Sequence, residues 1–337
     1  MTTLHLKTGG GEYDITVGRG ILGEAARLFN LGRRVIILTD SGVPKEYSER
    51  IAGLAREAKI LTVAEGEGSK SLATLEDVLR AMAEFNMTRG DCLVAVGGGV
   101  VGDLGGFAAS CYMRGIDFYN VPTTLLSQVD SSIGGKTAVN LGGIKNIVGA
   151  FYQPKGVLID TACLDTLDQR QVSAGLAEVV KMAMTSDAAL FSKLESKTLV
   201  DIMADIEPII VSALKIKRAV VEADERESGV RRILNFGHTV GHGIEALTGL
   251  YHGECVALGM IPLTAPRIRA RLISALRALG LPTEWRGDVD AVIALAAHDK
   301  KCVGNGVMAV AVDEIGSYKI KKMTADALRD LCLAAFA

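Results

Sequence analysis

The sequence has no apolar run approaching the ~20 residues that span a bilayer, and it contains one tryptophan and only 5% aromatic side chains. Its charges nearly cancel, since 37 Lys and Arg face 39 Asp and Glu for a net charge of −2. No basic run interleaves with aromatic residues. These features argue against a nucleic-acid or membrane partner and favour a small-molecule ligand held by local groups.

Paired cysteine motifs are also missing. The six cysteines are scattered without a Cys-x-x-Cys pair, at positions 92, 111, 163, 255, 302 and 332. The N-terminal stretch "MTTLHLKTGGGEYDITV" lacks the apolar core of a secretory signal. Together these features predict a cytoplasmic protein with free thiols.

The chain has 337 residues, of which 49% are hydrophobic, so it can bury a substantial core and accommodate two domains of roughly 100–200 residues each. Strand-like and helix-like patterns alternate through its first half. The expected strands cover 35–40, 59–67 and 91–99, and the expected helices cover 45–58 and 72–85. This alternation predicts an α/β domain with a Rossmann-like, largely parallel sheet.

Strand signals become rare after residues 156–160, and helical periodicity dominates. The expected helices include 175–184, 208–223, 271–280 and 324–336. The polar stretch 160–171 interrupts both patterns. We therefore expect an α/β domain over 1–168 and a mainly helical domain over 169–337, with the ligand site in the cleft between them.

Three consecutive glycines, 97–99, end the third expected strand, and a helix is expected to open near Asp103. Glycines let backbone N–H groups approach a pyrophosphate, although a tight strand-to-helix turn alone would use the same residues. A second run, Gly-Gly-Lys-Thr at 134–137, resembles a phosphate loop. Ser131 occupies its first glycine position, which argues against a nucleotide-hydrolysing P-loop.

Five histidines occur in the chain, and three of them, His238, His242 and His252, lie within 15 residues of one another. A lone histidine is more often a hydrogen-bonded core residue, but three together with a carboxylate favour a divalent metal site. Glu178 is a candidate carboxylate, and Lys181 follows it at i+3. A surface ion pair is the plainer interpretation of such a pair in isolation, but the apolar residues around it favour a cleft over solvent. Spacing alone does not decide which two histidines bind the metal.

Seven ordered segments between about residues 40 and 301 resemble the 3-dehydroquinate synthase family, which belongs to the sugar-phosphate cyclases. They are "GEGSK" (66–70), "GGGVVGDLGGFAAS" (97–110), "YMRGIDFYNVPTTLLSQVDSSIGGKTAVN" (112–140), "KNIVGAFYQP" (145–154), "GLAEVVK" (175–181), "RRILNFGHTVGHGIEA" (231–246) and "HGECVALGM" (252–260).

The resemblance implies a zinc or cobalt site formed by Glu178, His238 and His252. His242 then becomes a substrate-side or proton-transfer group. The i, i+4 spacing of His238 and His242, taken alone, suggests a different ligand pair.

The resemblance also implies an NAD site and a substrate site. NAD contacts fall on Asp40, Glu67, Lys70, Gly99, Val100, Val101, Gly102, Asp103, Thr123, Thr124, Lys136, Lys145 and Thr166. Catalytic and substrate contacts fall on Asp130, Lys136, Asn146, Lys181, Lys217, Arg231, Asn235, His242 and one of Lys300 and Lys301, with Lys301 preferred. Arg114 is expected to reach the substrate phosphate across the interface of a homodimer.

The implied reaction converts 3-deoxy-D-arabino-heptulosonate 7-phosphate to 3-dehydroquinate and phosphate in the shikimate pathway. It proceeds by transient oxidation with NAD, β-elimination of phosphate, re-reduction, ring opening and aldol closure. Another sugar-phosphate cyclase, such as an amino-dehydroquinate or inosose-type synthase, is the nearest alternative. A metal-dependent polyol dehydrogenase and a catalytically silent regulator are more distant ones.

Overall fold

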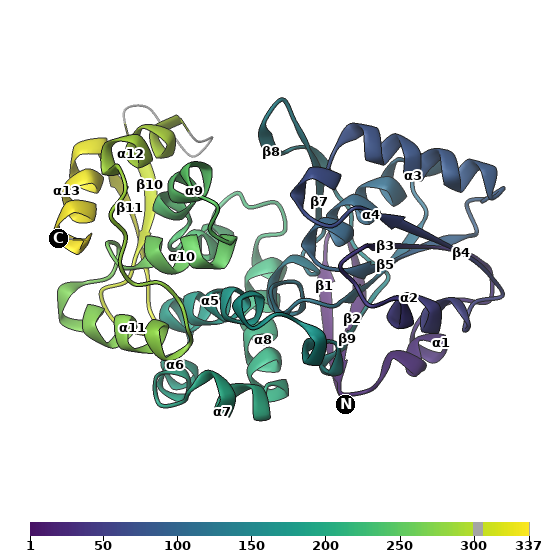
Figure 1. Ribbon diagram of the computed structural model, residues 1–337, viewed down its shortest axis with the longest axis horizontal. Coiled ribbons are helices and arrows are strands. Elements are labelled where there is room, and N and C mark those ends of the chain that lie inside the picture. Colours follow the sequence, from purple (N-terminus) through teal and green to yellow (C-terminus); the bar gives the residue numbers. More distant parts are fainter. Residues whose placement is uncertain (299–305, 337) are drawn as a thin grey trace. The chain divides into compact units, whose positions relative to one another are not determined.

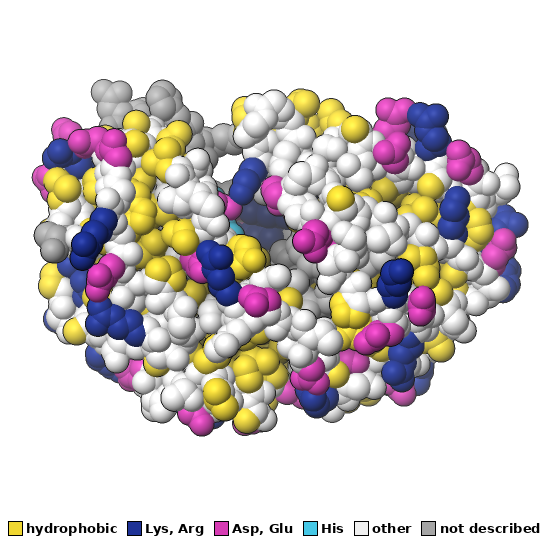
Figure 2. Space-filling model, viewed as in Figure 1, with side chains coloured by type: hydrophobic (Ala, Val, Ile, Leu, Met, Phe, Trp, Pro, Cys, Tyr) yellow, Lys and Arg dark blue, Asp and Glu magenta, His cyan; other side chains and the backbone are white. Residues whose placement is uncertain are grey.

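The computed structural model describes residues 1–298 and 306–336, which form two compact units, Met1–Leu167 and Asp168–Ala337. Each unit is considered by itself. Within the described ranges, no helix combines the length and apolar character needed to cross a membrane. On the face shown in Figure 2, acidic and basic side chains are interspersed, as expected from the near-zero net charge.

The first unit is built on a seven-stranded sheet with the strand order β1-β2-β9-β6-β5-β3-β4 (Figure 1). Its strands are β1 (Thr2–Thr8), β2 (Gly11–Gly18), β3 (Arg34–Asp40), β4 (Glu57–Val63), β5 (Cys92–Gly97), β6 (Asp117–Pro122) and β9 (Gly156–Asp160). All neighbouring pairs are parallel except β1 and β2. This arrangement confirms the predicted α/β class.

Both faces of the sheet are buried, because alternate residues of each strand point to opposite sides. On β3, Ile36 and Leu38 join one apolar cluster, whereas Val35 and Ile37 join the other. The first cluster includes residues of α3 (Leu72–Glu84) and α4 (Gly99–Cys111), and the second includes residues of α1 (Ala25–Leu28) and α2 (Lys45–Ala52). A buried parallel sheet therefore explains why β3 reads as a continuous apolar run.

Two helix boundaries in this unit differ from the sequence-based expectation. The helix expected over 45–58 ends at Ala52, because β4 begins at Glu57 and pairs in parallel with β3. The helix expected near Asp103 begins a turn earlier, at Gly99, directly after the glycine that caps it. The first error arises because non-local strand pairing outweighs local helix preference, and the second because glycine is tolerated at a helix start.

A two-stranded antiparallel ribbon, β7 (Lys136–Leu141) and β8 (Ile144–Phe151), completes the α/β unit with several short turns. Lys136 starts a strand and not a helix, so Gly-Gly-Lys-Thr has no P-loop geometry, as expected. The short turns are η1 (Leu22–Glu24), η2 (Glu67–Ser69), η3 (Tyr112–Arg114), the π-turn η4 (Ser127–Ser131) and η5 (Thr161–Thr166).

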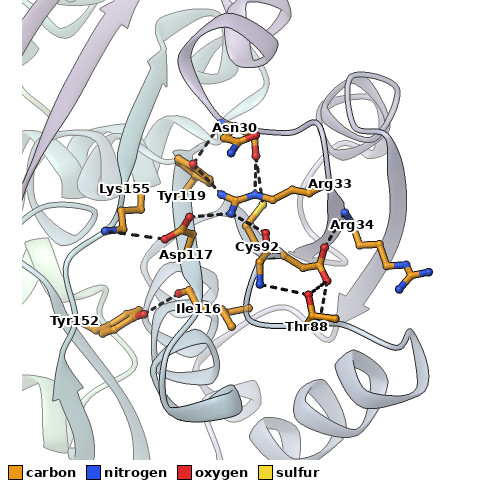
Figure 3. A network of polar contacts seen from close by, with 12 residues as sticks. Asn30, Arg33, Arg34, Thr88, Cys92, Ile116, Asp117, Tyr119, Tyr152 and Lys155 are labelled. Atoms are coloured by element: carbon orange, nitrogen blue, oxygen red, sulfur yellow. Dashed lines mark hydrogen bonds and ion pairs between the residues drawn. The ribbon is translucent and has the colours of Figure 1, made fainter.

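The starts of β3, β5 and β6 are joined by the guanidinium of Arg33 (Figure 3). Arg33 Nη1 lies 2.8 Å from Asp117 Oδ2, Nη2 donates to the Tyr119 hydroxyl at 3.1 Å, and Nε donates to the Asn30 carbonyl at 2.8 Å. Burial raises the pKa of the neighbouring Cys92 thiol to about 11. This network lies at the amino ends of the strands and stabilises the end of the sheet opposite the glycine-led helix.

The second unit is mainly helical, as predicted (Figure 1). Its helices are α5 (Gln169–Ser186), α6 (Ala188–Glu195), α7 (Leu199–Ala204), α8 (Glu207–Ala223), α9 (His238–Leu247), α10 (His252–Met260), α11 (Pro266–Ala278), α12 (Val289–His298) and α13 (Ala325–Phe336), with the 3-10 turn η6 (Val230–Asn235). An antiparallel pair, β10 (Val307–Ala311) and β11 (Lys319–Met323), was not predicted.

Candidate active site

Glu178 lies in the middle of α5 and is completely buried. Its Oε2 forms an ion pair with Lys181, one turn further along, which is 1% exposed. A surface ion pair, the plainer interpretation of the spacing alone, is wrong because both side chains are buried, as the apolar surroundings indicated. Burying a carboxylate and an ammonium group costs free energy that their pairing seldom repays. Such a pair is therefore a candidate functional site.

Two histidines begin the helices that pack beside Glu178. His238 is the first residue of α9, and His252 is the first residue of α10. Gly237, which caps α9, has φ +80°, and a Cβ there would lie 2.6 Å from the Val256 carbonyl oxygen of α10. Only glycine fits this position, so the backbone of α10 fixes where α9 starts.

The imidazoles converge on the buried carboxylate. Nε2 of His238 lies 3.7 Å, and Nε2 of His252 3.6 Å, from Glu178 Oε1. The ring of His242, one turn along α9, has its centroid 5.2 Å from that of His238 and 5.8 Å from that of His252. One nitrogen from each of the three rings lies within 4.8 Å of the other two. The cluster therefore has the donor types and spacing of a divalent metal site.

Two pKa values show how strongly these groups interact. Burial favours the neutral acid of Glu178, but the charge of Lys181 and the nearby His252 imidazole outweigh it and lower the pKa of Glu178 to about 2. Burial opposes the charged form of His252, but the neighbouring carboxylates of Glu178 and Glu245 raise its pKa to about 9.

The residues fit a metal ion by a further criterion. Within the described part of the chain, Glu178 Oε1 accepts no hydrogen bond although it is fully buried. A buried carboxylate oxygen without a donor is costly unless a cation or a protonated imidazole faces it. An ion between Oε1 and the two Nε2 atoms would satisfy that oxygen.

Buried cations lie elsewhere in the same unit. Lys217 on α8 and Arg231 in η6 are 4% and 3% exposed. The loop before η6 is organised by Asp224, whose carboxylate accepts backbone N–H groups from Ser228, Gly229 and Arg231. Such buried cations suit a ligand that carries phosphate and carboxylate groups.

Two carboxylates of this region were missed from the sequence. Glu227 accepts a hydrogen bond from Asn235 Nδ2 at 2.7 Å and has φ +59°. Glu245 lies 3.0 Å from His252 Nδ1. Glu245 could have been found, because it follows His238 by seven residues and His242 by three, which places all three on one face of a helix. Glu227 gave no comparable signal. The predicted contacts Lys300 and Lys301 lie outside the described residues.

In the α/β unit, the predicted cofactor residues gather at the carboxyl ends of adjacent parallel strands. Asp40 ends β3, Gly97 ends β5, and Thr123 follows β6. A crevice at this end of an open parallel sheet is the usual nucleotide site. Asp40 Oδ1 accepts the Gly42 N–H at 2.9 Å, and burial raises the pKa of Asp40.

The glycine-led start of α4 offers backbone N–H groups close to other side chains. A Cβ on Gly98 would lie 3.1 Å from Thr124 Cγ2, and a Cβ on Gly99 would lie 3.0 Å from Ser131 Oγ. Ser131 Oγ is buried without a hydrogen-bond partner in the ranges described. A helix amino end with an unsatisfied hydroxyl nearby fits a pyrophosphate. Val100, Val101 and Gly102 follow Gly99 in the first turn of α4.

Other predicted cofactor residues are linked to one another. Lys70 Nζ lies 2.5 Å from Asp103 Oδ2, and Glu67 Oε1 accepts from Asn140 Nδ2 at 2.7 Å. Asn140 Oδ1 in turn accepts the backbone N–H of Asn146 at 2.8 Å, next to Lys145 on β8. These contacts connect η2, α4 and the β7–β8 ribbon.

Thr166 is placed differently, because its hydroxyl lies 3.0 Å from the Tyr47 hydroxyl and donates to the Cys163 carbonyl. Among the predicted substrate residues of this unit, Lys136 lines a small cavity with Asp103 and Ser131. Asp130 lies on η4, next to Ser131. Arg114 is exposed with φ +69°.

Comparison with known proteins identifies the family. The chain matches the family models described as 3-dehydroquinate synthase N-terminal over residues 60–174 and C-terminal over residues 175–302. It is 44% identical to the 3-dehydroquinate synthase of Enterococcus faecalis, over 94% of this chain and 95% of the relative.

Solved structures agree in fold. A 2-deoxy-scyllo-inosose synthase complexed with carbaglucose-6-phosphate, NAD+ and Co2+ matches with a TM-score of 0.89 and 26% identity, over 99% of this chain and 100% of the other. The 2-epi-5-epi-valiolone synthase of Streptomyces hygroscopicus with NAD+ and Zn2+ bound matches with a TM-score of 0.88 and 28% identity, over 96% of each chain.

Fold and site thus define a sugar-phosphate cyclase, with a parallel-sheet unit and a helical unit that carries a carboxylate–histidine cluster. The chain belongs to the 3-dehydroquinate synthase family. This membership confirms the predicted function, a phosphate-eliminating carbon–oxygen lyase of the shikimate pathway and aromatic amino acid biosynthesis.

Proposed function

We propose that the chain catalyses the 3-dehydroquinate synthase reaction with a divalent metal held by Glu178, His238 and His252 and with NAD held at the carboxyl ends of β3, β5 and β6. The observation that carries the proposal is the buried Glu178 Oε1, which faces Nε2 of both histidines at 3.6–3.7 Å. The bound groups would supply a Lewis acid for a substrate hydroxyl and a reversible hydride acceptor.

The helical unit contributes charge and proton handling. Lys181, Lys217 and Arg231 are buried cations that would bind the carboxylate and hydroxyl groups of the substrate in a low-dielectric setting. The Asn235 amide, oriented by Glu227, would donate to a substrate oxygen. The His242 imidazole would transfer a proton near the substrate hydroxyl, because its ring lies 5.2 Å from that of His238, beside the proposed metal ligands.

The α/β unit would hold the phosphate. Lys136 and Asn146 belong to the β7–β8 ribbon, and Asp130 lies near the start of α4. Arg114 is exposed on this unit, where it is available to the site of a second subunit in a proposed homodimer. With the phosphate held in one orientation, its own oxygen can take the proton that β-elimination requires. The five cysteines among the described residues form no disulfide, which supports the proposal of a cytoplasmic enzyme.

Glu178→Gln tests the metal assignment. The amide keeps the size of the side chain but loses its charge, so we expect loss of bound metal and of phosphate release. Glu314→Gln, at an exposed position paired with Arg267, is the matched control. Full turnover with unchanged metal content in Glu178→Gln would refute the assignment.

The reaction itself is tested by phosphate release from 3-deoxy-D-arabino-heptulosonate 7-phosphate by metal-stripped protein, with and without zinc and NAD, while absorbance at 340 nm is followed. We expect release only with both additions and no accumulation of NADH. Release from a different sugar phosphate alone would favour another cyclase of the class, and steady NADH formation on a polyol would indicate a dehydrogenase.

A further inference from the structure

Glu245, near the end of α9, contacts a predicted metal ligand without belonging to the predicted ligand set. Its Oε2 lies 3.0 Å from His252 Nδ1. Its side chain is 16% exposed, compared with 30% for His252, so the contact is partly shielded from water. The two nitrogens of an imidazole point away from each other, and Glu245 therefore meets His252 on the side of the ring opposite Glu178.

This contact fixes which nitrogen of His252 carries a proton. An ionised carboxylate can only accept a hydrogen bond, so Nδ1 must donate to Glu245. In the neutral ring the lone pair then resides on Nε2, the atom that lies 3.6 Å from Glu178 Oε1. The hydrogen bond also restricts rotation of the ring.

His238 is oriented by a different acceptor. Its Nδ1 lies 3.2 Å from the Phe236 carbonyl oxygen, which likewise can only accept. In both predicted histidine ligands, Nε2 is thus the nitrogen that faces Glu178. A neutral carbonyl orients His238, whereas a carboxylate orients His252.

The backbone of His252 is held separately. Glu254 accepts the Tyr251 N–H at 2.7 Å and pairs with Arg170, whose Nε and Nη2 donate to its two oxygens at 2.6 and 2.8 Å. Arg170 belongs to α5, the helix that carries Glu178. The contacts of Arg170 on α5 therefore hold the start of α10 in place, and Glu245 orients the His252 ring.

We infer that Glu245 is a positioning residue that sets the tautomer and orientation of His252 for a divalent metal ion. The inference rests on the proposed metal set. Outer carboxylates of this kind typically change metal affinity by about 10–100-fold.

The test is the affinity of metal-stripped protein for Co2+, measured by competition with a chromophoric chelator, together with the visible absorption of the bound cobalt. For Glu245→Ala we expect affinity weaker by about 10–100-fold and an altered spectrum. Glu245→Gln should fall between it and the wild type, because its amide oxygen still accepts from Nδ1 without the charge. Glu314→Gln is the control.

Thermal melting of the metal-free variants separates positioning from folding. A purely structural role would lower the melting temperature and leave the cobalt affinity of the folded protein unchanged. Cobalt affinity within twofold of the wild type in both Glu245 variants, with the same spectrum, would overturn the inference. If His252→Ala also bound cobalt like the wild type, the metal assignment itself would be wrong.

Discussion

Replacing Gly253 with alanine should separate two helices that form the metal cluster. A Cβ at Gly253 would lie 1.9 Å from the Ala174 carbonyl oxygen on α5, whereas real Cβ contacts essentially never fall below 3.0 Å. Because the obstacle is backbone, α10 must move by at least about 1.1 Å, or α5 must distort. Gly253 follows His252 directly, and Ala174 precedes Glu178 by about one helical turn.

A shift of this size exceeds the tolerance of about 0.2 Å that metal–ligand distances allow. Gly253→Ala should therefore lose at least tenfold in Co2+ affinity and about 1–3 kcal/mol in stability through overpacking. Chelator competition and urea unfolding measure the two effects. Gly249→Ala is the matched control, because nothing lies within 4 Å of a Cβ there. Wild-type cobalt affinity in Gly253→Ala would refute the view that this close approach sets the site.

Three further outcomes follow from other parts of the chain. Burial acts against the ionised form of Asp224, but hydrogen bonds from the backbone of Arg231, Gly229 and Ser228 lower its pKa from 3.8 to about 2. Asp224→Asn should therefore be less stable than the wild type above pH 4 and equally stable near pH 2, as measured by urea unfolding. Arg33→Met should destabilise the protein by about 2–3 kcal/mol in urea unfolding, yet leave the NAD affinity of the folded protein unchanged. Among the described cysteines, native alkylation followed by peptide mapping should label Cys111 first, because the other four are buried.

The sequence predicted those features that depend on local pattern. Burial on both faces makes the segment Val35–Leu38 read as one apolar run, and the glycines at 97–99 marked the strand-to-helix turn. Features that depend on distant partners were not predictable. The helix at 45–58 was drawn too long because β4 pairs with β3, and β10 and β11 were missed because each is short and depends on the other.

The candidate site shows the same division. Spacing identified His238, His242 and His252 as a group but could not choose among them, and the structure brings one nitrogen from each within 4.8 Å of the others. The family resemblance supplied the choice of ligands. Burial of the Glu178–Lys181 pair could not be read from its i, i+3 spacing, because whether a helix face meets solvent is decided by the packing of the other helices.

The proposed metal ligands all come from the helical unit, and the proposed NAD contacts all come from the α/β unit. Neither ligand set needs residues from the other unit, so each ligand has its own intrinsic affinity. Any change in metal affinity on adding NAD would therefore measure the free energy that links the two units, and by reciprocity the metal must change the affinity for NAD by the same factor. Two titrations would thus report the communication between the units without any substrate present.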